Sequence, residues 1–377
     1  MIKTSKEVKL YVYFGLLLSV LTYVTIQLYI KSTLPQVSWT ASDWLINYED
    51  GGFKRRGLSG SFLFFCQDQF HISLPIQILC IQVIFFCFIF YFLIRIILTK
   101  KINWDILILI CSPLCLLYLP VSIFNSGRKE IILLALILFF MSGKSTQFKK
   151  YFLFGGFILG LFLHELFYFY LPFVMAAYIL KTKKIDVKYL GSLFFVSTFI
   201  IIILFFFGGE INQGQSIKIL NNRGIELNKW NIFTYDAVKE RKDMLVAYQS
   251  YILFSLELIF MTFLSFFFVK KHLPQYKNAF KIFILVSLVW VSPLYYLGAD
   301  WFRWNHIYSF LLIILIISAL PDYNGKSLCL EGRFNIPLLI IIALFFVEFY
   351  LHIQYDSAGN SAEYLLDFIE SKLHLKS

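Results

Sequence analysis

One stretch decides the fold class: SLPIQILCIQVIFFCFIFYFLIRIIL at residues 73–98, in which Arg95 is the only charged residue. A transmembrane helix needs about 20 mainly apolar residues. Lipid offers no partner to backbone N–H and C=O groups, so a spanning segment of this kind must be helical. The stretch therefore predicts one complete membrane crossing.

Similar runs recur along the 377 residues, of which 59% are hydrophobic and only 15% are charged. A soluble domain carries about 25% charged residues. We predict an all-α polytopic membrane bundle of about 11 transmembrane helices, forming a single membrane domain over residues 1–377. The predicted spans lie near 10–31, 73–98, 103–123, 130–143, 151–164, 166–180, 189–208, 250–269, 279–298, 307–320 and 335–351.

The net charge of +11 is distributed in a way that indicates membrane orientation and argues against nucleic-acid binding. Lysines and arginines form short clusters between apolar runs, and such clusters favour the cytoplasmic side. Alternate loops gather most of these cations, whereas the remaining loops are close to neutral. The pattern predicts a cytoplasmic N-terminus and a C-terminus on the other side of the membrane.

Three segments outside the spans are predicted on the non-cytoplasmic side. They are a loop at 32–72, a loop at 209–249, and a tail at 352–377 whose residues 362–375 have an amphipathic pattern. The chain contains no G-x-x-x-x-G-K-[ST] phosphate loop and no H-E-x-x-H motif. No cofactor or metal site is therefore expected.

Polar residues gather at five places that the topology puts on this same side, the fifth being the 209–249 loop. The first is residues 47–60, where Glu49 and Asp50 precede Lys54, Arg55 and Arg56 among four glycines. Glycine lets the backbone approach another group closely. This pattern favours a tightly folded functional loop, and the alternative is a solvated connector.

The second place is Arg128-Lys129-Glu130, and the third is His164-Glu165 between the two shortest spans. Arginine and lysine both bind phosphate, arginine through its planar fork. The alternative for these two cations is snorkelling of long side chains to the interface. Ionisable groups at membrane depth are functional by default, although His164 and Glu165 could simply pair with each other.

The fourth place is residues 300–306, a predicted hairpin tip in which aromatic and polar residues alternate. Its candidate sugar-binding residues are Asp300, Trp301, Trp304 and His306, with Arg303 as a further cation. Aromatic faces stack on sugars, and the alternative is an aromatic belt at the membrane interface. The mixed charges of the 209–249 loop are a weaker signal.

Carboxylates, arginines and aromatics at one membrane face suit the transfer of a group from a lipid-linked phosphate. A leaving diphosphate needs positive charge where its own charge develops. The acceptor hydroxyl needs a carboxylate to take its proton.

The chain resembles the Wzy-type polymerases of bacterial O-antigen and capsule synthesis and, more loosely, multi-span GT-C glycosyltransferases. The resemblance lies in the many spans, the outer loops with arginines and the richness in Phe, Ile, Leu and Tyr. Glu49-Asp50 resembles the acidic motif that GT-C enzymes carry in their first outer loop. The chain departs from the commonest pattern in lacking one dominant long loop late in the sequence.

The resemblance implies an enzyme that joins oligosaccharide repeat units carried on undecaprenyl diphosphate. Membrane lipid is the other expected partner, and a chain-length regulator is a further candidate. It implies the base to be Glu49 or Asp50, with Glu165 competing. The diphosphate would contact Arg55, Arg56, Arg128, Lys129 and Arg303, and the sugar would contact His164, Asp300, Trp301, Trp304 and His306.

Three other functions share parts of this pattern. A single-sugar GT-C transferase or a membrane-bound acyltransferase would have the same face and cations. A lipid-linked oligosaccharide flippase or other transporter would place its charges within the spans to line a path. Here nearly all the charges lie at the outer ends of the spans, which argues against transport.

Overall fold

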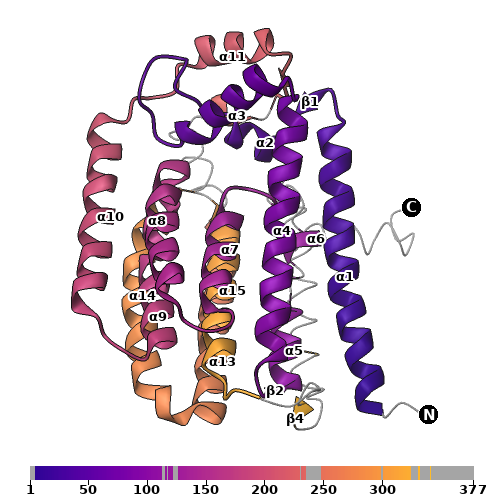
Figure 1. Cartoon of the computed structure of the whole chain (residues 1–377), viewed down its shortest axis with the longest axis vertical. Coiled ribbons are helices and arrows are strands. Elements are labelled where there is room, and N and C mark those ends of the chain that lie inside the picture. Colours follow the sequence, from indigo (N-terminus) through magenta and orange to yellow (C-terminus); the bar gives the residue numbers. More distant parts are fainter. Residues whose placement is uncertain are drawn as a thin grey trace.

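Helices dominate the computed structural model, and most of them run parallel to its long axis (Figure 1). The structure describes residues 5–112, 115–116, 118–121, 126–229, 231–234, 248–298, 300–323, 330–331 and 340. The predicted span at 335–351 and the tail at 352–377 lie outside these residues, apart from residue 340. So does part of the 209–249 loop.

The long helices follow the apolar runs of the sequence. They are α1 (Ser5–Ser32), α4 (Leu74–Leu98), α10 (Val187–Phe207), α13 (Tyr248–His272), α14 (Lys277–Leu297) and α15 (Trp301–Ala319). Within the described part, five segments are long and apolar enough to cross a membrane: Tyr13–Ser32, Leu74–Leu98, Val187–Phe207, Pro274–Tyr296 and Trp301–Ala319. The chain is thus a largely helical protein with membrane-spanning segments, and the predicted total of about 11 stays a prediction.

The shorter elements cover the rest of the described chain. They are α2 (Trp39–Trp44), α3 (Gly57–Phe70), α5 (Trp104–Ile110), α6 (Tyr118–Val121), α7 (Glu130–Met141), α8 (Gln147–Leu163), α9 (Leu171–Thr182) and α11 (Gln213–Asn222), with 3-10 turns η1 (Glu165–Tyr170), η2 (Ile232–Thr234) and η3 (Pro274–Tyr276). Side chains of Asn103, Thr146, Asp186 and Asn212 cap α5, α8, α10 and α11 by accepting from backbone N–H groups.

Two sequence predictions about local structure are wrong. The segment 103–123 is not one continuous helix, because α5 ends at Ile110 and a separate short helix, α6, follows. Pro113 follows closely in the sequence, and proline disfavours helix in the residue before it. Residues 301–306 are not a hairpin tip: they form the first turns of α15, which begins at Trp301.

The connection between α8 and α9 agrees with the predicted turn at His164-Glu165. His164 has extended backbone, and η1 then leads into α9. At the opposite end of these helices, Lys149 and Lys181 donate to backbone carbonyls at the C-terminal end of α7, including that of Ser142. The basic connections α7–α8 and α9–α10 therefore lie together at one end, called here the basic end.

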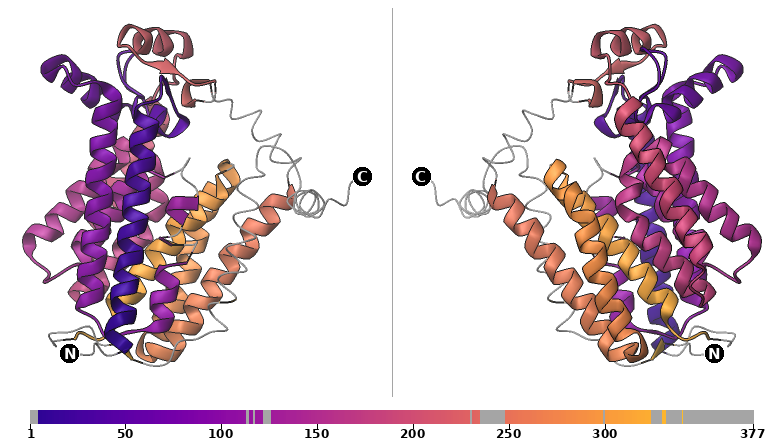
Figure 2. Two further views of the ribbon diagram at one scale, coloured as in Figure 1. Left: turned by 90° about the vertical axis from the view of Figure 1, so that its right-hand side faces the viewer. Right: turned by 90° about the vertical axis from the view of Figure 1, so that its left-hand side faces the viewer.

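The other end carries α2, α3 and α11 (top of Figure 1) and is called here the α2–α3 end. Strand β1 (Gln36–Val37) pairs in parallel with β3 (Glu226–Leu227) at this end, and β2 (Ile102–Asn103) pairs with β4 (Leu330–Glu331) at the basic end. Figure 2 shows α13 and α14 inclined to the nearly upright α1 and α4. Helix α15 is almost wholly buried among its neighbours.

Helix α3 starts against the backbone that precedes it. The amide of Gly60 donates to the carbonyl of Ile46 at 3.0 Å, and a Cβ on Gly60 would lie 2.3 Å from that oxygen. Since real Cβ atoms do not approach a backbone oxygen so closely, glycine is required here. The contact fixes the start of α3, where Arg56 is the N-cap.

We predict that Gly60→Ala lowers the thermal stability of the purified protein, because the methyl group must push α3 away from Ile46. Gly155→Ala is the matched control. Gly155 lies inside α8 and a Cβ there meets nothing within 4 Å, so alanine should be neutral or stabilise by about 0.5–1 kcal/mol. Equal melting temperatures for the two variants would contradict the close approach.

Candidate functional site

Nine ionisable side chains meet beneath the α2–α3 end and form what is called here the charge cluster. Its members are Asp43, Arg56, Arg128, Lys129, Glu130, His164, Glu165, Asp300 and Arg303. They come from α2, the N-terminus of α3, the start of α7, the α8–η1 turn and the start of α15. Segments far apart in the sequence thus build one site.

Arg56 joins the first and third predicted motifs. Its Nε lies 3.0 and 2.9 Å from the two carboxylate oxygens of Glu165, and its second terminal nitrogen lies 2.6 Å from Oε1. Its other terminal nitrogen lies 3.5 Å from Oδ1 of Asp43. Arg56 has φ 65°, a left-handed conformation that is costly outside glycine. Fold and ion pairs together hold this guanidinium in place.

A second group of ion pairs centres on Arg303. Its two terminal nitrogens lie 2.6 Å from Glu130 and 2.7 Å from Asp300. Asp300 also accepts from Arg128 at 3.0 Å. Arg128 is 3% exposed and Asp300 is 38% exposed, so the pair runs from the interior to an accessible edge. The guanidinium of Arg128 also lies over the ring of Trp39, 5.8 Å from its centroid.

Lys129 is fully buried, and its Nζ donates to the backbone carbonyl of Arg56 at 3.3 Å. Among the described residues no carboxylate oxygen forms an ion pair with it within 4.0 Å. Burial lowers the pKa of Lys129 to about 8, and the more distant charge of Asp43 opposes that shift only in part. The ammonium group is therefore charged but incompletely compensated at neutral pH.

His164 is held as a neutral ring. The backbone N–H of Leu166 donates to its Nδ1 at 3.1 Å, so the ring hydrogen belongs on Nε2. Burial, reinforced by the charges of Arg56 and Arg303, keeps the pKa of His164 well below its usual value. Its Nε2 is 3.7 Å from Glu130 and has no hydrogen-bond partner within the described structure. His164 is thus a hydrogen-bond donor aimed at the cluster.

Asp43 is the member that the sequence motifs did not reveal. It is 1% exposed, and its Oδ2 has no hydrogen-bond partner among the described residues. Burial would raise the pKa of Asp43, but the charges of Lys129, Arg56, Arg128 and Arg303 outweigh it and hold that pKa below its ordinary value. The result is an ionised carboxylate with one uncommitted oxygen, surrounded by cations.

Glu165 differs from Asp43 in that both its oxygens are occupied by Arg56. Burial acts to raise the pKa of Glu165, and the adjacent guanidinium more than reverses this effect. Asp300 behaves similarly, because Arg303 and Arg128 offset burial and lower its pKa. Both carboxylates are ionised at neutral pH, but their oxygens already accept strong hydrogen bonds.

Glu49 and Asp50 make their contacts elsewhere. Glu49 is 44% exposed and pairs with Arg223 at 2.9 Å, and Arg223 pairs in turn with Asp68 at 2.7 Å. Asp50 is buried, pairs with Lys54 at 2.9 Å and accepts from the hydroxyl of Ser216 in α11. These two carboxylates tie the 47–56 loop to α11 and to its C-cap residue, Arg223. Arg55 is exposed beside the cluster and acts on Glu165 through its charge.

The aromatic candidates divide by exposure. Trp301 is half-buried and donates to the carbonyl of Gly298 at 3.0 Å. Trp304 is 5% exposed and packs edge-on against Tyr295. His306 is buried two residues further along α15 and stacks on Tyr118 with ring centroids 3.9 Å apart. Trp301 is the aromatic residue best placed to meet a ligand.

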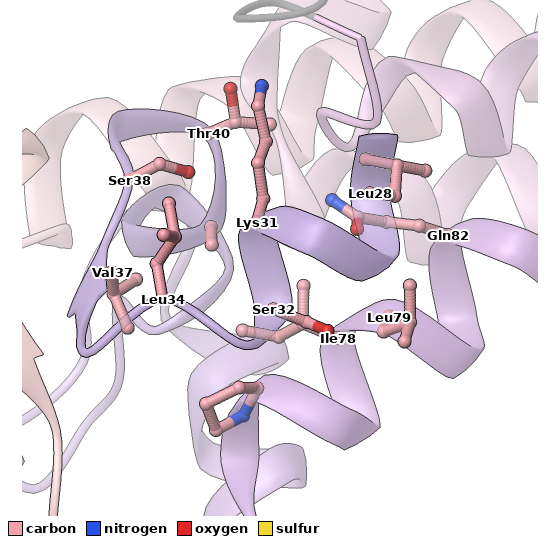
Figure 3. A pocket seen from close by; sticks show the side chains of 12 residues that line it. Leu28, Lys31, Ser32, Leu34, Val37, Ser38, Thr40, Ile78, Leu79 and Gln82 are labelled. Atoms are coloured by element: carbon pink, nitrogen blue, oxygen red, sulfur yellow. The ribbon is translucent and has the colours of Figure 1, made fainter. Parts of the chain in front are cut away.

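A separate cavity of about 30 Å³ lies between the end of α1 and the start of α4 (Figure 3). It has room for about one or two water molecules. Lys31, Ser38, Thr40 and Gln82 line it with several apolar residues. A cavity of this size does not hold a sugar or a diphosphate.

Comparison with known proteins gives no relative: no family profile, curated protein or solved structure matches this chain. Within the described residues no group of three or more His, Cys, Asp or Glu side chains is arranged to hold a metal ion.

We predict a pH-dependent stability difference between the wild type and Lys129→Met. The pKa of Lys129 is about 8 in the folded protein and 10.5 in the reference state, so the folded state binds fewer protons between these values. Stability of the wild type relative to the variant should rise with pH in this window, by at most about 1.4 kcal/mol per pH unit.

Thermal unfolding at pH 7.5 and pH 10 measures this difference. Lys144→Met, at an exposed position near the basic end, is the control and should follow the wild type. Parallel pH curves for the wild type and Lys129→Met would contradict the burial of a depressed lysine in the charge cluster.

Proposed function

We propose that this chain is a membrane glycosyltransferase that polymerises oligosaccharide repeat units carried on undecaprenyl diphosphate. One observation carries the proposal: the ionised carboxylate of Asp43 has a free oxygen in the midst of four cations. A base for an acceptor hydroxyl and positive charge for a leaving diphosphate are the two groups that this reaction needs.

The step is a direct displacement at the anomeric carbon of the donor sugar. A hydroxyl of the acceptor unit gives its proton to Oδ2 of Asp43, and its oxygen bonds to the anomeric carbon. The bond from that carbon to the diphosphate oxygen breaks, and the diphosphate leaves with its lipid and both bonding electrons. Asp43 replaces Glu49 and Asp50 as our preferred base, and Glu165 remains the competing candidate.

The cations outnumber the carboxylates only slightly. Arg55, Arg56, Arg128, Lys129 and Arg303 face Asp43, Glu130, Glu165 and Asp300. A diphosphate therefore adds negative charge where Lys129 is incompletely compensated. It can also take the place of the accessible Asp300 carboxylate beside Arg128, since arginine binds phosphate and carboxylate with the same fork.

Orientation supports a lipid-linked donor. The basic end gathers Lys149, Lys181 and Lys100, and clusters of this kind favour the cytoplasm. The charge cluster then faces the periplasm of the bacterial inner membrane. Nucleotide-sugars are confined to the cytoplasm, so a transferase working there draws on a polyprenyl-linked sugar. The neutral Nε2–H of His164 and the half-buried Trp301 are the proposed sugar contacts nearest the cations.

A single-sugar transferase with a polyprenyl-linked donor is the second candidate, because the same base and cations would serve it. The two functions differ in product rather than in the charged groups of the site. A flippase is less well supported, since these charges lie at the ends of the helices and not along them.

We predict that deleting the gene from its host leaves single repeat units on the surface lipid in place of a ladder of long chains. A flippase deletion would instead leave few units on the surface, and an acyltransferase deletion would leave chain length intact. Gel electrophoresis of surface polysaccharide gives the answer, and a full-length ladder after deletion would contradict polymerisation.

Complementation then tests the base. Asp43→Asn should give the single-unit phenotype at a normal protein level in the membrane, because the amide cannot accept a proton at neutral pH. Asp68→Asn, which changes an exposed carboxylate at the same end, should restore the full ladder. Loss with Glu165→Gln alone, and a normal ladder with Asp43→Asn, would move the base to Glu165.

A further inference from the structure

A groove of about 860 Å³ lies between α9 and α14, with contributions from α10 and α15. Figure 1 shows these helices in the left half of the view. The groove starts near Leu171, just after η1, and follows α9 to the turn at the basic end. Its lining is almost wholly apolar and includes Leu171, Met175, Ile179, Phe283, Trp290 and Ile316.

The surface around the groove is apolar and exposed, as in a protein surface that faces lipid. Ile282, Val286 and Val289 of α14 are 50–65% exposed, and α10 and the segment containing α14 are both long and apolar enough to cross a membrane. In water such a continuous apolar face would promote aggregation. Against a bilayer it contacts acyl chains, and a groove in it is a place where one chain can lie between helices.

Two lysines lie at the basic end of the groove. Lys183 and Lys184 line its mouth and are both exposed. The nearest carboxylate in the sequence, Asp186, is committed to capping α10 through the amide of Tyr189 and to the hydroxyl of Tyr178. Among the ion pairs of the described residues neither lysine takes part.

The turn fixes the backbone of these two lysines. Lys183 is the C-cap of α9 with φ 54°, and its amide donates to the carbonyl of Ile179 at 2.8 Å. The amide of Lys184 donates to the hydroxyl of Thr182. Two exposed lysines that take no part in the ion pairs of the described residues therefore lie at one end of a slot that can accept a hydrocarbon chain.

We propose that this groove is a binding site for an anionic phospholipid of the leaflet at the basic end. One acyl chain lies between α9 and α14, and the phosphate contacts Lys183 and Lys184. The charge of the mouth selects the headgroup, since a basic residue near a membrane surface contributes about 1 kcal/mol toward an anionic lipid. The site is distinct from the charge cluster, which lies at the other end of the bundle.

Trp290 makes this site measurable because it lines the groove. Bromine atoms on an acyl chain quench tryptophan fluorescence on contact. We expect phosphatidylglycerol with brominated chains, at a low mole fraction in phosphatidylcholine nanodiscs, to quench the intact protein. Phosphatidylcholine with the same chains should quench far less at that fraction. The anionic-selective part of the quenching should vanish in Trp290→Phe.

Three further variants separate the contribution of the lipid headgroup from that of the acyl chain. Lys183→Gln and Lys184→Gln should each raise the half-quenching fraction of the anionic lipid about fivefold, from the loss of about 1 kcal/mol. Ala279→Phe, placed in the groove lining, should weaken the anionic-selective quenching of Trp290, because it fills the slot without adding a tryptophan. Lys144→Gln is the control for an exposed lysine outside the groove.

Equal quenching by the two lipids would overturn the proposal, because it would indicate ordinary surface contact with the bilayer. So would anionic-selective quenching that survives both lysine changes. Displacement of the brominated lipid by undecaprenyl phosphate, in a manner insensitive to Lys183→Gln and Lys184→Gln, would assign the groove to a substrate tail instead. None of these readouts depends on transfer activity, so the proposed reaction is tested separately.

Discussion

The charged side chains beneath the α2–α3 end can be buried only where oppositely charged groups lie close by. This constraint determines how the ends of several helices pack together. Taking an unpaired charge out of water costs several kcal/mol. Arg56 is satisfied by Glu165 and Asp43, and Arg303 by Glu130 and Asp300. These pairs connect α2, α3, α7, η1 and α15. The same contacts therefore form the site and hold the helix ends together.

The compensation is complete for some groups and incomplete for others, and the proposed reaction uses the incompletely compensated ones. Glu165 has both oxygens on one guanidinium, whereas Asp43 keeps Oδ2 free, Lys129 has no close carboxylate within the described residues, and His164 keeps an unused Nε2–H. An acceptor, a cation and a donor are therefore left available in one buried place. In the proposed reaction, the substrate's hydroxyl donates to the acceptor, its diphosphate pairs with the cation, and its sugar accepts from the donor.

The sequence predicts the long helices well, because a long apolar run is itself what a lipid bilayer requires of a membrane-crossing helix. It also predicts that Arg56, Arg128, His164 and Asp300 belong to one face. It does not predict the pairing of Arg56 with Glu165, 109 positions away, since one sequence contains no information on distance in space. The sequence does not single out Asp43, because it stands alone between two tryptophans, Trp39 and Trp44, whereas Glu49-Asp50 has the more conspicuous pattern. An isolated acid within an aromatic stretch was the available signal.

Transfer by purified protein in liposomes, using a synthetic undecaprenyl-diphosphate-linked repeat unit, tests the central claim most directly. The wild type should form lipid-linked dimers and longer oligomers and release undecaprenyl diphosphate in equal molar amount to the linkages made. Asp43→Asn should bind the lipid-linked unit as the wild type does but form linkages at a rate at least about a hundredfold lower, as expected for a lost general base. Oligomers formed at the wild-type rate by Asp43→Asn would contradict the account.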